Sequence, residues 1–428
     1  MRIFFWAVVL GLVQGCSLLK ADYQMWENDK TVYFTGTVET DHEARGPLVV
    51  VLYKKGAKPV PVYINVIPRQ RGVYHLGVPG TLATGSYGIF AFEDVDEDLQ
   101  YSAGEPFAVY DGKALPLSAI NDPPSQSEGL GHIVIASASA SAQSPLAFGE
   151  AYDALLQRRE QSFGGQVSIG QSRFDAARVR EGMFQPLKFG SEGQVGLFML
   201  QPFDPGKVPV VFVHGIGGSP RDWVEVISNL DKEHFQPWVA YYPSGASIGY
   251  SALVLSSAMD ELRYRHPSAD SVVVAHSMGG LVAMGSLNIA MREGRVPPVK
   301  LLVTISTPWL GNRAARWAQS APTRALDSWL DIAPGSDFLD SVLAYPRPPQ
   351  LCHVLFYGYG GSSMFVKGDN DGVVAISSVL APSATSRAEQ IVGFDEGHES
   401  ILRSDAMQDA LNARLATYLR NPACEASP

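Results

Sequence analysis

One serine of this chain stands in a context that can turn its hydroxyl into a nucleophile. Ser277 follows the β-branched run Ser271–Ala275, and an apolar helical pattern begins at Gly279. This arrangement predicts a strand, a sharp turn and a helix, in which small neighbours make room for a strained serine that stands above a sheet. Ala275 replaces the first glycine usual in such a turn and is small enough for that place. Ser277 is therefore the candidate nucleophile, against the alternative of a glycine-rich turn without chemistry.

A serine hydroxyl needs a base to take its proton, and the base needs an acid that fixes its tautomer. We expect the base at His398, which follows the predicted strand Glu389–Phe394. We expect the acid at Asp371, directly before Gly372, and Asp369 remains the alternative. Both loops follow the carboxyl end of a strand, which is where open α/β sheets place their active sites.

Negative charge that develops during attack on a carbonyl needs backbone donors aimed at it. A second strand ends in His214 and Gly215, and a glycine-rich loop follows. We expect the N–H groups of Ile216 and Met278 to form this oxyanion hole. The same glycines could belong to a phosphate-binding loop, but no lysine follows as in a P-loop, and Pro220 stands where a dinucleotide loop has glycine or alanine.

The strands and helices that must position these residues can be predicted from the pattern of residues 146–428. Apolar strands alternate there with helical stretches, which predicts an α/β domain with a mostly parallel sheet flanked by helices. The expected strands are Val195–Leu200, Val208–Val213, Gln236–Tyr242, Ser271–Ala275, Val299–Ser306, His353–Tyr357 and Glu389–Phe394, and the expected helices are Ser251–Arg265, Gly279–Arg292 and about 400–419.

Residues 16–145 show a different pattern and are expected to form a small all-β sandwich followed by a Ser/Ala-rich linker. The expected strands are Thr31–Thr37, Leu48–Tyr53, Val60–Ile67, Gly72–Val78, Ser86–Phe92 and His132–Ala136. The acidic residues from Asp94 to Glu105 have the spacing of a calcium loop, but Leu99 replaces the turn glycine. A solvated acidic hairpin is therefore preferred, and no metal site is predicted.

The first residues read as a targeting signal. Arg2 precedes the apolar stretch Ile3–Val13, which is too short to span a bilayer because about 20 residues are needed. The run that ends in Cys16 resembles a bacterial lipobox, so residues 1–15 are predicted to be a lipoprotein-type signal peptide. Cys16 would then carry palmitate-type acyl chains and anchor an exported protein to the periplasmic or outer-membrane face of a bacterial membrane. A plain signal peptide with an incidental cysteine is the alternative.

Composition narrows the function classes. The chain has 428 residues, of which 46% are apolar and 18% charged, so it is a globular protein large enough for two or three domains. Its net charge of −10 argues against nucleic acid as a partner, because a phosphate backbone requires a basic surface. Cys352 and Cys424 remain after Cys16 and could form a disulfide in an oxidising compartment, with two buried free thiols as the alternative.

These motifs together resemble the bacterial lipase and esterase branch of the α/β-hydrolase superfamily, over about residues 190–420. The resemblance implies a catalytic triad of Ser277, Asp371 and His398, an oxyanion hole at Ile216 and Met278, and carboxylic ester substrates, often of lipids, with no cofactor. It also implies a cap over the pocket at about residues 307–347.

The predicted cap is rich in aromatic and aliphatic residues. It contains Trp309, Trp317 and Trp329, and it suits an acyl chain. A helical layer whose aromatic face is simply core fits the same pattern equally well.

The sequence thus predicts a membrane-anchored serine hydrolase that cleaves lipid or other esters through an acyl-enzyme. The alternatives are an acyltransferase or thioesterase on the same residues, and a non-catalytic surface binding module. Zinc hydrolysis is disfavoured because the second histidine of H-E-x-x-H is missing after His398. The oligomeric state is left open.

Overall fold

The structure is a computed structural model of the chain. It describes residues 32–68, 70–78, 86–110, 131–141, 146, 148–267, 270–316, 325–345, 348, 350–363, 366, 368–386 and 388–422. The chain forms two compact units that divide between Gln161 and Ser162.

The first unit contains two small sheets that share a core. One sheet has the order β4-β1-β7 and the other the antiparallel order β3-β2-β5-β6. Side chains such as Val38 and Ile133 from the first sheet pack with Val50 and Ile89 from the second. The strands are β1 (Val32–Thr40), β2 (Leu48–Lys54), β3 (Val60–Ile67), β4 (Arg71–Val78), β5 (Tyr87–Glu93), β6 (Phe107–Tyr110) and β7 (His132–Ile135). The separate small β region is therefore confirmed, and β6 is an additional strand.

Helix α2 (Glu150–Ser162) explains where the first unit ends. Tyr152, Leu155 and Leu156 of this helix pack against the outer face of the four-stranded sheet. The hydroxyl of Tyr152 also donates a hydrogen bond to the carbonyl of Leu99, at 2.6 Å. The division consequently lies after α2, whereas the sequence placed it between residues 145 and 146.

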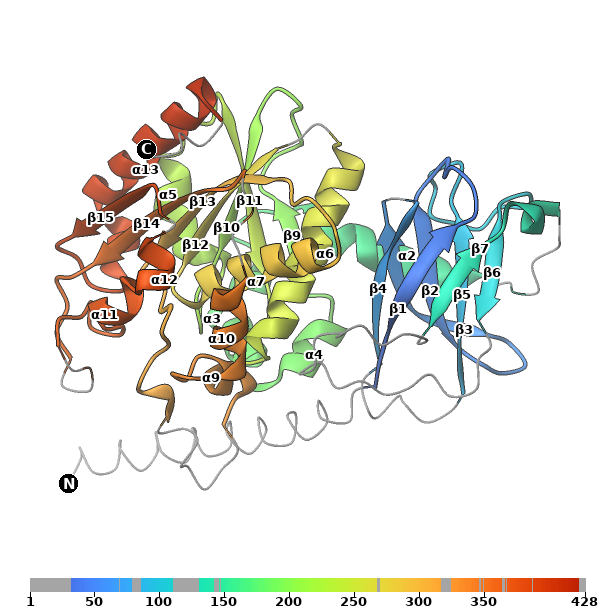
Figure 1. Ribbon diagram of the computed structural model, residues 1–428, viewed down its shortest axis with the longest axis horizontal. Helices are drawn as coiled ribbons and strands as arrows, with labels where there is room; N and C mark the ends of the chain where they lie inside the picture. The colour runs from blue at the N-terminus through green and yellow to red at the C-terminus, as the bar shows by residue number, and fades with distance from the viewer. Residues whose placement is uncertain are drawn as a thin grey trace. The chain divides into compact units, whose positions relative to one another are not determined.

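The second unit is built on an eight-stranded sheet with the order β15-β14-β13-β12-β10-β11-β9-β8 (Figure 1). Its pairs are parallel except for β9, which runs antiparallel to β11. This confirms the predicted α/β class and mostly parallel sheet. The strands are β8 (Phe163–Gln166), β9 (Gly196–Met199), β10 (Val208–Val213), β11 (Phe235–Tyr241), β12 (Ser271–His276), β13 (Val299–Ile305), β14 (Cys352–Gly358) and β15 (Gln390–Phe394).

Helices cover both faces of this sheet, which explains why its central strands are apolar at nearly every position. Val211 and Val213 of β10 face the core that includes α6 and α7, while Val210 and Phe212 face the core that includes α5 and α13 (Figure 1). The helices are η2 (Ser172–Phe174), α3 (Ala176–Phe184), α4 (Pro186–Ser191), η3 (Pro220–Trp223), α5 (Val224–Ser228), α6 (Ile248–Arg265), α7 (Met278–Arg292), α9 (Asp327–Asp331), α10 (Asp337–Ala344), α11 (Ile376–Val379), α12 (Pro382–Thr385), η4 (Ser400–Arg403) and α13 (Asp405–Arg420), and η1 (Ser137–Ser141) lies in the first unit.

The parallel strands end at one edge of the sheet, and four of their loops carry the predicted site residues. The glycine-rich loop follows β10, Ser277 follows β12, Asp371 lies in the loop after β14, and His398 lies in the loop after β15. Because neighbouring parallel strands point the same way, residues far apart in the sequence meet at this edge.

Candidate active site

Ser277 occupies the turn between β12 and α7 in a conformation that side chains rarely adopt. Its φ is 54° and its ψ is −128°. Its N–H donates to the carbonyl of Ile305 on the neighbouring strand at 2.8 Å, which fixes the turn against the sheet. Such strain persists only where the surroundings over-determine it, and it is typical of functional sites.

Two glycines leave the space that this turn needs. A Cβ on Gly279 would lie 2.4 Å from the carbonyl oxygen of Val213, and a Cβ on Gly215 would lie 3.0 Å from the Cβ of Ser277. Ala275 is fully buried and pairs with Val213 and Thr304 on the adjacent strands. The sheet therefore accepts a methyl group at position 275, where the motif usually has glycine.

The structure brings Ser277, His398 and Asp371 into one hydrogen-bonded chain. Nε2 of His398 lies 2.9 Å from Oγ of Ser277, and Nδ1 of His398 lies 2.7 Å from Oδ2 of Asp371. All three residues are buried. A proton on Nδ1 that points at the carboxylate leaves Nε2 free to accept the serine proton. These are the contacts of a nucleophile, a base and a group that orients the base.

Asp371 is held ionised by the donors around it. Burial acts to raise the pKa of this carboxyl, but hydrogen bonds from His398, Val374 and Val373 outweigh it and hold the pKa below its usual value. Oδ1 accepts the N–H groups of Val374 at 2.7 Å and Val373 at 3.0 Å, so Oδ2 is left for His398. Asp369, the alternative acid, is exposed. The geometry thus places Asp371, and not Asp369, against the imidazole.

Ile216 and Met278, the residues predicted to form the oxyanion hole, lie in the two turns that meet at Ser277. Met278 is the first residue of α7, so its N–H has no acceptor within the helix. Ile216 lies in the loop after β10, whose next residue, Gly217, has a φ of 65° and donates its N–H to Oγ of Ser244 at 3.0 Å. The loop thus turns sharply beside Ser277, with Gly215 against the serine side chain.

The glycine-rich loop is fixed at both ends. His214 stacks on Tyr242 with ring centroids 4.2 Å apart, and burial lowers the pKa of His214 to about 4. At the other end, Ser219 and Asp222 form a capping box at the start of η3. Burial raises the pKa of Asp222 to about 6.

His276 contacts this site and is not among the residues predicted from the sequence. Nε2 of His276, the last residue of β12, lies 2.9 Å from the backbone carbonyl oxygen of His398. The adjacency of His276 to Ser277 was a signal in the sequence. The contact with a residue on a distant loop was not, because it depends on the direction of that loop.

The described part of the predicted cap lies largely in the core. Ile332, Leu339 and Val342 pack in the cluster that includes α6 and α7, and Trp309 is 1% exposed in the same cluster. Leu326 packs with Trp329 and with residues of α3. Trp317 lies outside the described residues. The described segments 307–316 and 325–345 therefore fit the alternative of a helical layer whose aromatic face is core.

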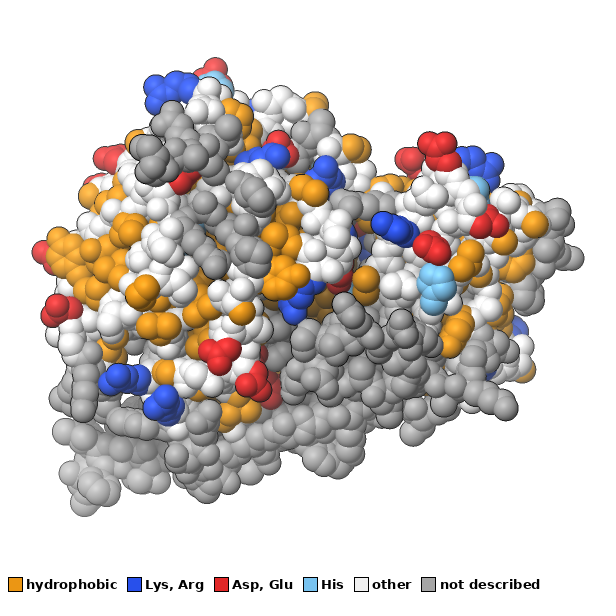
Figure 2. Space-filling model, viewed as in Figure 1, with side chains coloured by type: hydrophobic (Ala, Val, Ile, Leu, Met, Phe, Trp, Pro, Cys, Tyr) orange, Lys and Arg blue, Asp and Glu red, His pale blue; other side chains and the backbone are white. Residues whose placement is uncertain are grey.

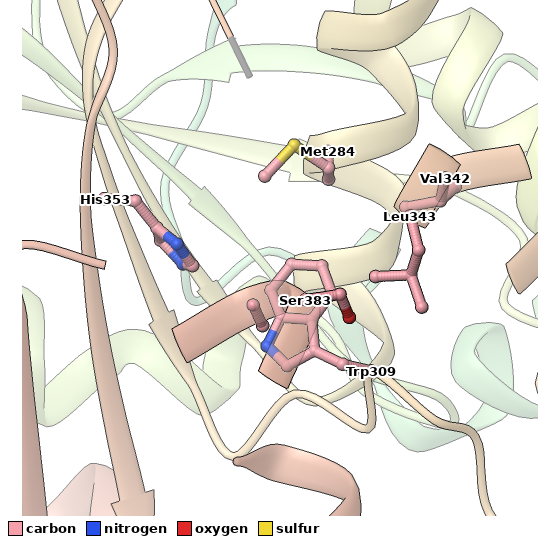
Figure 3. A pocket seen from close by; sticks show the side chains of 7 residues that line it. Met284, Trp309, Val342, Leu343, His353 and Ser383 are labelled. Atoms are coloured by element: carbon pink, nitrogen blue, oxygen red, sulfur yellow. The ribbon is translucent and has the colours of Figure 1, made fainter. Parts of the chain in front are cut away.

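A small, partly open pocket lies at this layer (Figure 3). Figure 3 shows Met284 of α7 and Leu343 of α10 on one side and His353 of β14 on the other, with Trp309 and Ser383 between them. The indole Nε1 of Trp309 has no hydrogen-bond partner in the described structure. The lining does not include Ser277, Asp371 or His398.

Two groups of side chains in the described residues could hold a metal ion, and neither involves the triad. One is Asp94, Asp96 and Asp98, and the other is Asp231, Glu233 and His234. In the first unit, Glu105 accepts N–H groups from Val95 and Ser102 at 2.7 and 2.8 Å. Leu99, at the place of the turn glycine of a calcium loop, has a φ of 61°.

The predicted anchor and disulfide fall mainly outside the described structure. Cys16 and Cys424 are not among the described residues. Cys352 begins β14, is buried and is disulfide-bonded. None of the described helices has the length and the apolar character that crossing a membrane requires.

One protein family matches about half of this chain. The model of the alpha/beta hydrolase family matches residues 210–412. No curated protein sequence matches the chain. The lipase BlEst2 of Bacillus licheniformis in its mature form is similar at 19% identity and a TM-score of 0.42, covering 53% of this chain and 98% of that one.

Two further solved structures are similar over part of the chain. Phospholipase PlaB from Legionella pneumophila shows 14% identity and a TM-score of 0.35, covering 41% of this chain and 45% of its own. The type II thioesterase YbtT of the yersiniabactin pathway shows 16% identity and a TM-score of 0.35, covering 52% of this chain and 96% of its own. The sheet of the second unit and the family match over residues 210–412 agree with the α/β-hydrolase fold predicted from the sequence. The family match supports a hydrolase.

Proposed function

We propose that the chain is a serine hydrolase that cleaves carboxylic esters through an acyl-enzyme. The observation that supports this most directly is the hydrogen-bonded chain from Ser277 Oγ through His398 to Asp371, at 2.9 and 2.7 Å. Ser277 is the nucleophile, His398 the general base and acid, and Asp371 the residue that orients His398. Ile216 and Met278 supply the oxyanion hole.

In the first half of the reaction, Oγ of Ser277 attacks the ester carbonyl while Nε2 of His398 takes the hydroxyl proton. The carbonyl oxygen becomes an oxyanion that accepts the N–H groups of Ile216 and Met278. The C–O bond to the alcohol then breaks, and the alcohol leaves with the proton from Nε2. Asp371 stabilises the imidazolium that forms between these steps.

In the second half, water attacks the acyl group on Ser277 and passes a proton to Nε2 of His398. The tetrahedral intermediate collapses, the carboxylic acid leaves, and the proton returns to Oγ. The strained backbone of Ser277 holds Oγ in the same place for both halves, so no reorganisation is needed between them.

We further propose that lipid esters are the substrates. Two exposed apolar side chains lie on segments that are joined to the loop of Asp371: Leu310 is 45% exposed and Val373 is 41% exposed. The amide of Asn312 donates to the carbonyl of Val373 at 3.0 Å, which ties the two segments together, and the N–H of Val373 donates to Asp371. Figure 2 shows that hydrophobic side chains also gather over the face that carries α7 and α12. An apolar surface of this kind suits an acyl chain.

The substitution Leu310→Asp tests the apolar surface. We expect kcat/KM for a long-chain p-nitrophenyl ester to fall about tenfold relative to the butyrate ester, since the lost apolar contact is equivalent to one or two methylene groups. The matched control is Leu419→Asp on α13, which replaces another exposed leucine, 38% exposed, outside the site. An equal change for both chain lengths would count against an acyl-binding role of Leu310.

Location is a separate proposal: the protein is exported and held on a bacterial membrane by acylated Cys16. The support is the sequence of residues 1–16, a basic start and an apolar stretch that ends at a lipobox cysteine. We expect Cys16→Ala to move the full-length protein from the membrane fraction to the soluble fraction of the exported material. Retention of the variant on the membrane would refute a lipid anchor at this cysteine.

Hydrolysis of p-nitrophenyl esters of graded chain length, by the chain and by Ser277→Ala, tests the proposed reaction. A serine ester hydrolase releases p-nitrophenol only with Ser277 present. Turnover that depends on an added alcohol would indicate an acyltransferase, preference for thioesters a thioesterase, and no Ser277-dependent turnover a binding module.

A further inference from the structure

The ring of His276 connects the end of the nucleophile strand to the loop of the base. Its Nε2 lies 2.9 Å from the backbone carbonyl oxygen of His398, and the centroids of the two imidazole rings are 4.7 Å apart. His276 is 3% exposed and directly precedes Ser277. Any movement of the His398 loop away from Ser277 must therefore break this buried hydrogen bond.

Both backbone hydrogen-bonding groups of His398 are held by segments that carry its triad partners. Its N–H donates to the carbonyl of Asp371 at 2.7 Å, and its carbonyl accepts from His276. The peptide groups on the two sides of the His398 Cα are thus fixed, one to the acid loop and the other to the serine turn. These two hydrogen bonds fix the position of the His398 backbone relative to both Asp371 and Ser277, independently of the hydrogen bonds of the His398 ring.

The protonation state of His276 follows from this contact. A carbonyl oxygen only accepts, so the proton of His276 must be on Nε2. Burial and repulsion from the neighbouring His398 ring lower the pKa of His276 to about 3, so the ring is neutral at neutral pH and carries a single N–H. Neutrality matters because His398 becomes positive when it takes the serine proton, and a second charge nearby would oppose that step.

We propose that His276 is a positioning residue for His398: its neutral Nε2–H holds the backbone of His398 so that the imidazole stays within hydrogen-bond reach of Ser277 Oγ. This inference rests on the proposed function, because the distance between His398 and Ser277 limits a rate only in a serine hydrolase. Histidine is suited to this place because it combines a rigid ring, a neutral donor and the reach to the next loop.

Three substitutions of His276 separate the donor from the packing. His276→Phe keeps a buried ring without the donor. His276→Gln keeps a neutral N–H donor close to the position of Nε2, whereas His276→Asn carries the same amide on a side chain too short to reach His398. The control is His353→Phe, the same change at a buried histidine that bonds Thr304 at 2.9 Å.

We expect His276→Phe and His276→Asn to lower kcat for p-nitrophenyl butyrate by up to about 100-fold, the cost of a misplacement of about 1 Å, with KM within about twofold. His276→Gln is expected to recover most of the loss, and His353→Phe to keep the kcat of the parent chain. If His276→Phe fails to fold, the Gln and Asn variants still test the proposal, because they differ only in the length of the side chain that carries the amide. Equal kcat for the Gln and Asn variants would overturn the proposal.

A second measurement keeps this test separate from the ester hydrolase proposal. Diethyl p-nitrophenyl phosphate phosphorylates an activated serine without any ester turnover, and the mass of the full chain reports the rate. We expect the Phe and Asn variants to be labelled more slowly by the same factor as kcat. A parent chain that labels rapidly at Ser277 but hydrolyses no ester would refute the proposed function alone. Unchanged labelling in all His276 variants would refute the positioning role alone.

Discussion

Replacement of Ser277 by alanine is expected to lower kcat for p-nitrophenyl ester hydrolysis by about 10⁴-fold to 10⁶-fold, down to the rate that binding and the oxyanion hole alone support. The loss is this large because the acyl-enzyme cannot form without Oγ. The measurement is p-nitrophenol release by purified full-length protein, with the melting temperature of each variant recorded alongside.

Stability should change little in Ser277→Ala, which keeps the loss of activity interpretable. Alanine meets the same backbone strain as serine at a φ of 54°, and the N–H that bonds Ile305 is retained. The matched control is Ser286→Ala on α7, the helix that follows Ser277, where the buried hydroxyl only donates to the carbonyl of Ala283 at 2.8 Å. Equal activity of the two variants would exclude Ser277 as the nucleophile.

Asp371→Asn is the second large effect, with an expected fall in kcat of up to about 10⁴-fold. Oδ1 of Asp371 accepts the N–H groups of Val373 and Val374, so the oxygen of an asparagine must stay there and its NH₂ group must face His398. Nδ1 of His398 then has to accept, which moves the ring proton to Nε2. A protonated Nε2 cannot take the proton of Ser277, so the substitution imposes the wrong tautomer while keeping the shape of the site.

Asp369→Asn is the control for this assignment. Asp369 is exposed and lies on the same turn, and its backbone carbonyl accepts from Ile376 at 2.9 Å, a contact that the substitution leaves in place. We expect kcat within about twofold of the parent chain, as for a solvated surface carboxylate. Equal losses for the two asparagine variants, measured with the same butyrate ester, would refute Asp371 as the orienting acid.

The central strands were predictable because burial on both faces leaves a continuous apolar signal. Val208–Val213 was predicted with the bounds of β10, and the other predicted strands of the sheet differ from the structure by at most one residue at either end. The edge strand β8 was missed because Phe163–Gln166 is short and contains two glycines, which weaken any strand pattern. Helix α6 starts at Ile248, before the predicted Ser251, because Ser247 caps its N-terminus.

Those residues of the candidate site that belong to local sequence motifs could be predicted. Ser277 and His398 follow strand patterns closely, so the sequence placed both at the correct edge of the sheet. The choice between Asp371 and Asp369 depended on which carboxylate meets the N–H groups of Val373 and Val374, and a sequence does not show the course of such a turn. The contact of His276 with His398 joins the end of β12 to a distant loop, so no local pattern could indicate it.

The domain boundary and the role of the cap region could not be settled from the sequence for a related reason. The apolar face of α2 could pack on either neighbouring unit, and only the structure shows that Tyr152 packs on the first. In the cap region, aromatic side chains have the same spacing whether they line a pocket or fill a core. Trp309 belongs to the core and makes a T-shaped contact with the ring of His353, with ring centroids 5.7 Å apart.

The most direct test of the account is to trap the acyl-enzyme. Full-length protein is mixed with excess p-nitrophenyl butyrate, quenched with acid during turnover, digested and analysed by mass spectrometry. The account predicts that one butyryl group is found on the peptide that contains Ser277, and that it is absent from Ser277→Ala. Acylation of a different residue while Ser277 stays unmodified during undiminished turnover would contradict it.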